Sequence, residues 1–506
     1  MSAFWWYIIF GVIWLIFIII FYLSEGDSGL NKYEKSKVCA LPNAADLRAA
    51  LAASESSGVR EQISMLFDAG TFVETAAFMK RGFSDFISTE MAGEFEGVIT
   101  GYGAIDGRLV FAFAEDGERM GGAIDDRHAK KIADLYRLAL DNGAPVIGIF
   151  NSNGTDIFAG TSGLAAYGRI LATVNKASGV IPQIALVAGN CIGTAATIAA
   201  SFDIVVKESS ASLYVTSPSL THAEGAQDSI VSYSASMPEC AGYVRQLIGF
   251  LPDNASVGVQ VTNCSDNLNR LLGELNFAGE ALSAISVVAD NGVFIELGKG
   301  FAETAVTAFA TVGGVKCGIV ANSFAKNEGK LCTCCAKKIA RFVNLCDSFS
   351  IPVVTLVDSL GVTIDKNNEV GFASALAKLA SAYASSTCPK VTVIIGHAIG
   401  ASFVLLGSKA LGADIVYATD CSEIGALAAD SGVAFAWDKY ITEEKSREDY
   451  INEWRATVSS PANAAASGEI DDIISVSELR ARICSALLML ASKGCAAAAK
   501  RKVLPL

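Results

Sequence analysis

Histidine is scarce in this chain of 506 residues, which contains only His128, His222 and His397. That scarcity disfavours a metal centre built from histidines, and the sequence gives no reason to assign a metal ligand. No glycine-rich P-loop or ATP-grasp signature is evident, so ATP-dependent chemistry is not expected on this chain. Positive charge is also in deficit. The 39 Lys and Arg residues against 52 Asp and Glu give a net charge of −13, which argues against nucleic acid as a partner.

The 13 cysteines show no regular framework. With no cleavable secretory signal evident, they are interpreted as reduced thiols of a cytosolic compartment. Cys332, Cys334 and Cys335 form a tight group that invites a metal-site interpretation. Their spacing is too tight for the usual zinc knuckle, and no second pair or histidine lies nearby, so zinc is not predicted there.

An uninterrupted apolar run from Phe4 to Leu23 carries no charge. About 20 residues suffice to cross a hydrocarbon core as a helix. A cleavable signal peptide would need a basic start and a small-residue cleavage site, and neither is present. Three lysines follow the run between residues 32 and 37, and none precedes it. The positive-inside tendency therefore predicts a single-pass transmembrane helix at 4–23, a tether at 24–42, and a membrane location with the bulk of the chain in the cytoplasm.

Two halves of the remaining chain repeat each other. Residues 144–154 match residues 351–361, and residues 181–195 match residues 388–402, with a constant offset of 207 positions. A register held across such a gap indicates a tandem duplication of one domain. We predict a first domain at 43–260 and a second at 277–506, joined through a polar linker at about 253–276.

Each copy alternates strands, loops and helices. The first copy predicts a hairpin over 99–113 that turns at Asp106-Gly107, a helix over 126–141 ended by Asn142-Gly143, and buried strands over 146–150 and 184–187. This order is typical of an α/β fold with right-handed crossovers. A glycine turn follows each strand, and its backbone N–H groups are suited to holding a polarised oxygen.

Several motifs then appear in a fixed order: Ile63–Glu74, Val98–Gly103, Ile105–Arg108, His128–Ile132, Gly318–Asn322, Ala340–Val343, Ile351–Asp358, Gly407–Lys409 and Gly412–Asp414. In these motifs, over roughly residues 60 to 430, the chain resembles the carboxyltransferase subunits of biotin-dependent acyl-CoA carboxylases and decarboxylases. It also resembles the wider crotonase-like (ClpP/crotonase) superfamily. The resemblance implies two tandem crotonase-like domains and transfer of CO₂ between biotin and an acyl-CoA.

The resemblance also implies where the substrates bind. The first domain would hold the acyl-CoA and the second the biotin, in a site shared between subunits of a homo-oligomer. The residues carried over by position are listed here: Gly193 and Thr194 for the first oxyanion hole; Gly400, Ala401 and Ser402 for the second; and Ser152, Asn153, Gly154 and Gly361 for the loops that bind the two substrates.

The chain contains no Met-Lys-Met biotin-acceptor motif. Biotin is therefore expected on a partner, a biotin carrier protein, and not covalently on this chain. A biotin carboxylase or a membrane decarboxylase subunit is the other expected partner, as in the sodium-pumping decarboxylases. The span 4–23 holds no ionisable residue, so this chain alone is not the pump. The identity of the acyl-CoA and the direction of transfer stay open.

Some site motifs depart from the family pattern. Ser152–Asp156 stands where the family usually has Ser-Gly-Gly-Ala-Arg, and Gly193-Thr194 and Gly400-Ala401 replace paired glycines. These changes suit either an altered substrate or a catalytically inactive scaffold subunit. Ser402 raises a further alternative, a nucleophile as in membrane-bound signal peptide peptidases, with Lys176 or Lys207 as base. Local motifs match that family less well.

Overall fold

The structure is a computed structural model that describes residues 43–54, 57–81, 94–222, 228–270, 272 and 279–493. It divides into a short unit up to Glu55, which contains α2 (Ala44–Ser54), and a large unit from Ser56 onward, which contains two sheets. The predicted span 4–23 and tether 24–42 lie outside the described residues. Within the described ranges, no helix is both long enough and apolar enough to cross a bilayer.

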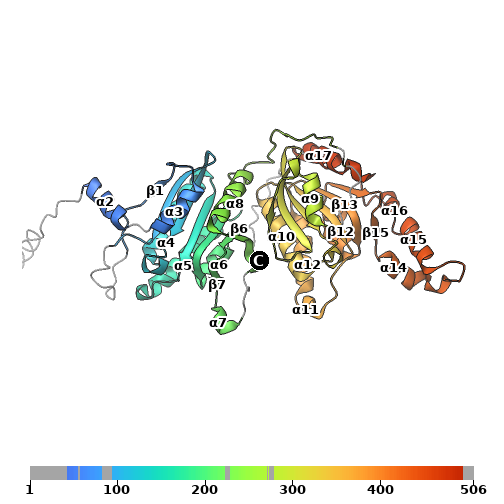
Figure 1. Ribbon diagram of the computed structural model, residues 1–506, viewed down its shortest axis with the longest axis horizontal. Coiled ribbons are helices and arrows are strands. Elements are labelled where there is room, and N and C mark those ends of the chain that lie inside the picture. The colour runs from blue at the N-terminus through green and yellow to red at the C-terminus, as the bar shows by residue number, and fades with distance from the viewer. Residues whose placement is uncertain are drawn as a thin grey trace, which may run out of the picture. The chain divides into compact units, whose positions relative to one another are not determined.

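The first sheet has eight strands in the order β1-β2-β3-β4-β5-β6-β8, with β7 paired to β5 (Figure 1). The β1–β2 and β2–β3 pairs are antiparallel, and the others are parallel. Its strands are β1 (Val73–Thr75), β2 (Val98–Ile105), β3 (Arg108–Glu115), β4 (Val146–Ser152), β5 (Gln183–Ile192), β6 (Ile204–Glu208), β7 (Ser212–Tyr214) and β8 (Val231–Ala235).

The second sheet repeats this plan in the order β16-β14-β13-β12-β11-β10-β9, with β15 paired to β13. Its strands are β9 (Phe294–Leu297), β10 (Ala305–Val312), β11 (Val315–Asn322), β12 (Val353–Ser359), β13 (Lys390–Ile399), β14 (Ile415–Thr419), β15 (Glu423–Gly425) and β16 (Asp472–Ile474). Strands β11, β12 and β13 have the bounds of β3, β4 and β5 shifted by 207 positions. The predicted α/β class and internal repeat are confirmed.

The predicted hairpin is β2–β3, and it turns at Asp106-Gly107. Both turn residues have positive φ, 49° and 76°, as a two-residue hairpin loop with the matching twist requires. In the second copy Gly313 and Gly314 occupy the same turn, with φ of 61° and 82°. An Asp-Gly or Gly-Gly pair therefore sets the register of each outer hairpin.

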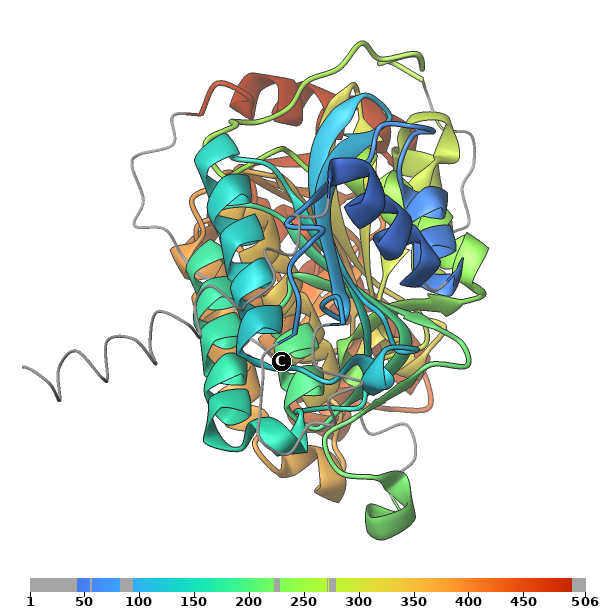
Figure 2. The same cartoon turned by 90° about the vertical axis from the view of Figure 1, so that its left-hand side faces the viewer.

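The predicted helix after the first hairpin is α4 (Asp126–Asn142). The Asp125 carboxylate caps its start by accepting the His128 N–H, and Gly143 ends it in the left-handed conformation with φ of 62°. Figure 2 shows α4 and α5 on one face of the first sheet and α3 on the other. The other helices of this half are α3 (Ser57–Leu66), α5 (Thr161–Ala177), α6 (Thr194–Ala200), α7 (Pro218–Thr221) and α8 (Met237–Phe250).

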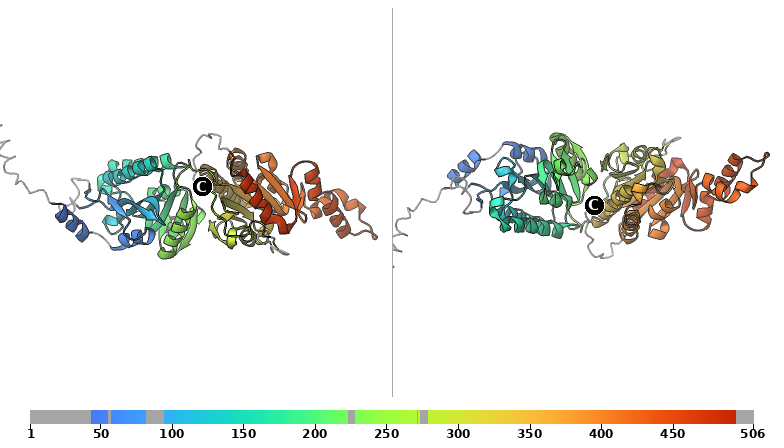
Figure 3. Two further views of the ribbon diagram at one scale, coloured as in Figure 1. Left: turned by 90° about the horizontal axis from the view of Figure 1, so that it is seen from above. Right: turned by 90° about the horizontal axis from the view of Figure 1, so that it is seen from below.

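The second half has its own helices and one addition. They are α9 (Ala281–Val288), α10 (Thr333–Ser348), α11 (Lys366–Glu369), α12 (Phe372–Ser385), α13 (Ala401–Leu405), α14 (Ala429–Gly432), α15 (Arg447–Thr457), α16 (Pro461–Ala466) and α17 (Leu479–Leu490). Helices α14 to α16 follow β15 and lie beyond it at the end of the second sheet (Figure 3). This insertion separates β15 from β16 along the chain.

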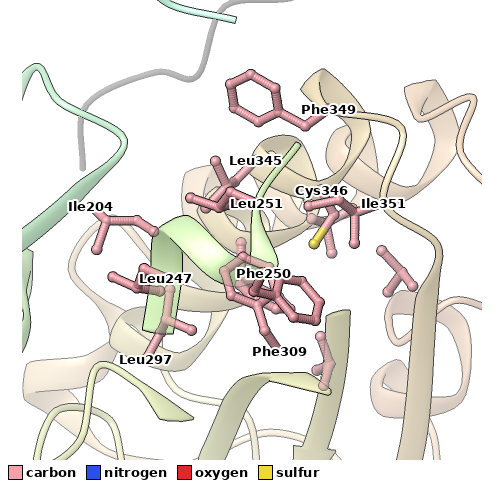
Figure 4. Packing of buried hydrophobic residues seen from close by; sticks show 14 of the residues in the cluster. Ile204, Leu247, Phe250, Leu251, Leu297, Phe309, Leu345, Cys346, Phe349 and Ile351 are labelled. Carbon is pink, nitrogen blue, oxygen red and sulfur yellow. The ribbon is translucent and has the colours of Figure 1, made fainter. Parts of the chain in front are cut away.

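One hydrophobic core joins elements of both halves (Figure 4). Phe250 at the end of α8 stacks on Phe309 of β10, with ring centroids 4.7 Å apart and planes at 20°. Leu247 of the same helix and Leu345 of α10 belong to this core. Burying each such side chain stabilises the fold by roughly 1.5–3 kcal/mol. The two repeats are thus held together by side chains, not by the chain connection alone.

The predicted linker runs along the second sheet. Over residues 253–270 the structure assigns neither a helix nor a regular strand, and an isolated bridge pairs Val261 with Val315. The Thr262 N–H donates to the Gly314 carbonyl at 2.7 Å. The exact domain bounds, 43–260 and 277–506, stay a prediction.

Candidate active site

The first glycine loop follows β4. The buried Ser152 hydroxyl donates to the Gly122 carbonyl at 2.7 Å, and its oxygen accepts the Gly154 N–H at 3.1 Å. Gly154 has φ of 120°, a conformation that side chains disfavour. Ser152 therefore fixes the loop shape from beneath, and is placed as a structural residue rather than a substrate contact.

The second glycine turn of this half follows β5. Gly193 has φ of 63° and ψ of −129°, and Thr194 begins α6. The Gly193 N–H donates to the Tyr214 carbonyl of β7 at 3.0 Å. The Gly193 N–H, which the prediction gave as a substrate donor, is thus already bound within the chain, and its assignment to the oxyanion hole stays a prediction. The first N–H groups of a helix have no intrahelical acceptor. No acceptor for the N–H of exposed Thr194 lies among the described residues, so Thr194 is the donor that can face a ligand.

Asn151, which sequence reasoning did not single out, ties the two loops together. Its Oδ1 accepts the Asn190 N–H at 3.1 Å, and the Asn190 amide donates to Asn153 Oδ1 at 2.7 Å. Gly189 makes this approach possible, since a Cβ there would lie 2.2 Å from Asn151 Oδ1. The predicted residue Asn153 is thus held against the end of β5.

The second half builds the same frame with different chemistry. Asp358, 207 positions after Asn151, accepts the His397 N–H at 2.9 Å and lies 2.8 Å from His397 Nδ1 through the same oxygen. The Phe324 ring stacks on His397 with centroids 4.6 Å apart. A Cβ at Gly396 would come within 2.4 Å of Asp358 Oδ1. The constant repeat offset was the sequence signal that could have identified Asn151 and Asp358 as a pair.

The turn after β13 matches the turn after β5. Gly400 has φ of 57°, and its N–H donates to the Gly425 carbonyl at 2.9 Å. The Gly400 N–H is therefore also bound within the chain, and its assignment to the second oxyanion hole stays a prediction. The Ala401 N–H starts α13, and none of the described residues accepts it. Gly361 has φ of 100°, and its N–H donates to Ser359 Oγ at 3.3 Å.

Ser402 is fully buried. Its hydroxyl oxygen accepts the Ile399 N–H at 3.1 Å and lies 2.8 Å and 3.0 Å from the carbonyls of Ile399 and Ser359. The Lys207 amine donates to three backbone carbonyls of its own loop, and Lys176 is exposed near the end of α5. The Ser402 hydroxyl therefore stabilises the turn through hydrogen bonds to the backbone. This arrangement gives no support to the alternative of a serine nucleophile.

Asp156, where the family usually has a basic residue, does not face the loops. It forms a buried ion pair with Arg81 at 2.8 Å, with both side chains at most 3% exposed. Asp156 also caps the short turn at Ile157–Ala159 by accepting the Phe158 N–H. The charge of Asp156 is thus neutralised by the buried Arg81 guanidinium, so the acidic residue does not add negative charge to the loop surface.

His128 is fully buried between two carboxylates. Its Nδ1 lies 3.5 Å from Glu96 and its Nε2 3.8 Å from Glu115. Burial raises the pKa of Glu115 to about 7, while His128 and the Asn151 N–H oppose that rise. The structure thus places His128 in the core.

A pH dependence of stability follows from Glu115. Between its ordinary pKa of 4.5 and about 7, the folded chain keeps a proton that the unfolded chain releases. The free energy of unfolding therefore falls as pH rises through that window, by about 3 kcal/mol at most for this group. Glu115→Gln is expected to flatten this fall in denaturant titrations across the window. The same substitution at exposed Glu118 is the control, and an unchanged slope in Glu115→Gln would contradict the assignment.

The described residues hold no group of three or more His, Cys, Asp or Glu that could bind a metal ion. What the two turns offer instead is one backbone donor each that is free among the described residues, the Thr194 N–H after β5 and the Ala401 N–H after β13, at the carboxyl ends of parallel strands. Such donors stabilise an oxygen that gains negative charge in a reaction. Two repeated crotonase-like sheets with one such turn each define the class of an acyl-transferring or carboxyl-transferring enzyme.

Comparison with known proteins gives the family. The carboxyl transferase domain matches residues 54–234 and 230–504. The chain is 34% identical over 461 residues to the alpha subunit of methylmalonyl-CoA decarboxylase from Veillonella parvula, covering 86% of this chain and 90% of that protein. It is 35% identical over 464 residues to the mitochondrial propionyl-CoA carboxylase beta chain of Rattus norvegicus, covering 86% and 85%.

Among solved structures, the chain is similar to transcarboxylase 12S, a hexamer with methylmalonyl-coenzyme A and methylmalonic acid bound. The TM-score is 0.81 at 31% identity, over 88% of this chain and 91% of that one. The chain therefore belongs to the carboxyltransferase family. The predicted activity, transfer of a carboxyl group between biotin and an acyl-CoA, is confirmed at the level of the family.

Proposed function

We propose that this chain transfers the carboxyl group of methylmalonyl-CoA to biotin carried by a separate protein, as the carboxyltransferase subunit of a decarboxylase complex. The observation that supports it is the set of relatives. Several are named for methylmalonyl-CoA or for propionyl-CoA, which differ by this one carboxyl group. The two decarboxylase subunits favour the direction of carboxyl removal.

The first turn suits the acyl-CoA half of this reaction. Loss of the carboxyl group leaves negative charge on the thioester oxygen, and a backbone N–H aimed at that oxygen lowers the barrier. Thr194 supplies such a donor without using its side chain. Thr194 is exposed, and nothing lies within 4 Å of the Cβ position of the neighbouring Gly193. The turn therefore has room for the thioester.

The second turn fits the ureido group of biotin. Gly361 closes on this turn so tightly that a Cβ there would lie 3.3 Å from the Ile399 carbonyl oxygen. The Ala401 N–H at the start of α13 would hold the ureido oxygen. When bound, biotin supplies the ring nitrogen that accepts the carboxyl group. The chain's part is to orient the group and to hold its oxygen through backbone donors.

The decisive experiment is a carboxyl-transfer assay on the full-length chain with a biotinylated carrier protein. Methylmalonyl-, malonyl- and glutaconyl-CoA are compared, and methylmalonyl-CoA is expected to give the highest kcat/KM. Gly400→Val should abolish transfer, since it adds a branched side chain at φ of 57° in the biotin-side turn. Gly468→Val, at φ of 78° with nothing within 4 Å, is the matched control. Absence of transfer from all three, or equal loss in both variants, would overturn the proposal.

The proposal includes an assembly and a location. A homo-oligomer is supported by the hexameric transcarboxylase 12S. A membrane tether is supported by the uncharged run 4–23 and the lysines that follow it. Alkaline extraction of a membrane fraction tests the tether. The chain should stay with the membranes, a chain lacking residues 1–37 should be released, and release of both would contradict the tether.

A further inference from the structure

Cys332 and Cys335 meet at the start of α10. Cys332 is the N-cap residue, with φ of −114° and ψ of 171°, and its sulfur accepts the Cys335 N–H at 3.2 Å. The two Sγ atoms lie 2.8 Å apart. Sequence spacing had raised these cysteines only as metal ligands. The structure instead brings two of the three into direct contact and leaves Cys334 exposed.

The two sulfurs have unequal surroundings. Cys332 is half-buried, whereas Cys335 is fully buried and its Sγ contacts the Thr304 hydroxyl at 2.7 Å. The hydrogen bond from Cys335 and nearby backbone N–H groups lower the pKa of Cys332, while the same contact raises the pKa of Cys335. An accessible thiolate next to a buried thiol, at a helix N-terminus, is the arrangement that makes a cysteine reactive in disulfide exchange.

The equivalent helix start in the first repeat, that of α4, shows which chemical group suits the N-cap position of α10. The offset of 207 positions places Asp125 at the position of Cys332 and His128 at that of Cys335. In the first copy the Asp125 carboxylate accepts the His128 N–H at 2.8 Å. A helix start favours an anion. In the second copy the Cys332 sulfur accepts the equivalent hydrogen bond. Oxidation to a disulfide removes the negative charge that its thiolate form carries.

We propose that Cys332 and Cys335 are a redox-active pair, oxidised to an intramolecular disulfide by a low-molecular-weight disulfide, and that this oxidation shifts the loop at Gly361. In the first step the Cys332 thiolate attacks one sulfur of the oxidant, whose S–S bond breaks and releases one thiolate. In the second step Cys335 loses its proton and attacks Cys332 Sγ, releasing the second thiolate. The chain loses two electrons, and the oxidant becomes two thiols.

Hydrogen bonds connect the pair to the biotin-side loop. Leu331, next to Cys332, donates its N–H to the Gly361 carbonyl at 2.9 Å and accepts the Thr363 N–H at 2.8 Å. Thr333, on the other side, donates its N–H to Asn368 Oδ1 at 2.6 Å. A disulfide would draw the sulfurs to about 2.05 Å and remove the anionic cap. The neighbours of Cys332 are bound to this loop, so it is the segment that would respond.

The test equilibrates the full-length chain in buffers of varied reduced-to-oxidised glutathione ratio, then traps thiols with a maleimide and maps peptides by mass. A Cys332–Cys335 disulfide is expected in oxidising buffer. Cys335→Ser should accumulate glutathione on Cys332, whereas Cys334→Ser should behave as the unchanged chain. Melting curves of each variant check folding. Alkylation of both Cys332 and Cys335 at every ratio in the unchanged chain would overturn the redox pair.

The effect on the loop rests on the proposed function and is read separately. Transfer from methylmalonyl-CoA to biotin should fall at least several-fold in the oxidised chain, and the fall should be reversed by a dithiol. The double variant Cys332→Ser, Cys335→Ser should not respond to oxidant. A disulfide with unchanged transfer would overturn the coupling to Gly361. Absence of transfer in both redox states would fail the proposed function, while the trapping result still decides the redox pair.

Discussion

Thr194→Pro is expected to lower kcat for carboxyl transfer by about 10²–10³, the effect of removing one oxyanion donor. Proline deletes the N–H that we assign to the thioester oxygen and changes little else. Thr194 is the first residue of α6, where proline is well tolerated because that N–H has no intrahelical acceptor. The preceding Gly193 has no Cβ to clash with the proline ring, so its ψ of −129° is compatible.

The control is Thr194→Ala, which removes the side chain and keeps the N–H. It should retain kcat within a few-fold, while both variants melt near the unchanged chain. A donor that acts only in the transition state lowers kcat and kcat/KM equally, so KM for methylmalonyl-CoA should stay constant. Equal activity of the proline and alanine variants would show that this N–H does not face the reacting oxygen. Ala401→Pro against Ala401→Ser asks the same question of the biotin side.

Local sequence rules were sufficient where one short segment determines the structure. The Asp106-Gly107 hairpin and the end of α4 at Gly143 both depend on a positive φ that few residues accept, and both were predicted. The repeat offset correctly paired the glycine turns at Gly193 and Gly400. These features need no knowledge of what packs against them.

Tertiary contacts decided the rest. The Gly193 N–H is bound by Tyr214, a partner that reaches it only once β7 pairs with β5. Asp156 lies in the loop whose altered charge suggested a changed substrate, yet Arg81, 75 positions away, pairs with it in the core. Cys332 and Cys335 are in contact because α10 begins at Thr333, which makes Cys332 the N-cap residue that accepts the Cys335 N–H. A spacing rule for metal ligands does not test for a cap.

Gly329→Ala is expected to destabilise the folded chain by about 2–5 kcal/mol. Gly329 has φ of 65°, and a left-handed backbone costs a residue with a side chain roughly 1–2 kcal/mol. In addition, its Cβ would lie 2.0 Å from the Asp358 carbonyl oxygen. That atom belongs to the end of β12 and cannot rotate away, so the strand or the Gly329 turn must move, at a further cost of about 1–3 kcal/mol.

Gly300→Ala separates the two contributions, because Gly300 has φ of 83° and nothing within 4 Å of its Cβ position. It should show the backbone cost alone, about 1–2 kcal/mol, in denaturant unfolding. Equal destabilisation of the two variants would mean that the end of β12 moves away from the added Cβ at no measurable cost in free energy. The close approach matters to the site because Asp358 holds the His397 N–H through its side chain. Displacing Asp358 should therefore reduce carboxyl transfer in Gly329→Ala, even under conditions in which the variant remains folded, whereas Gly300→Ala should transfer normally.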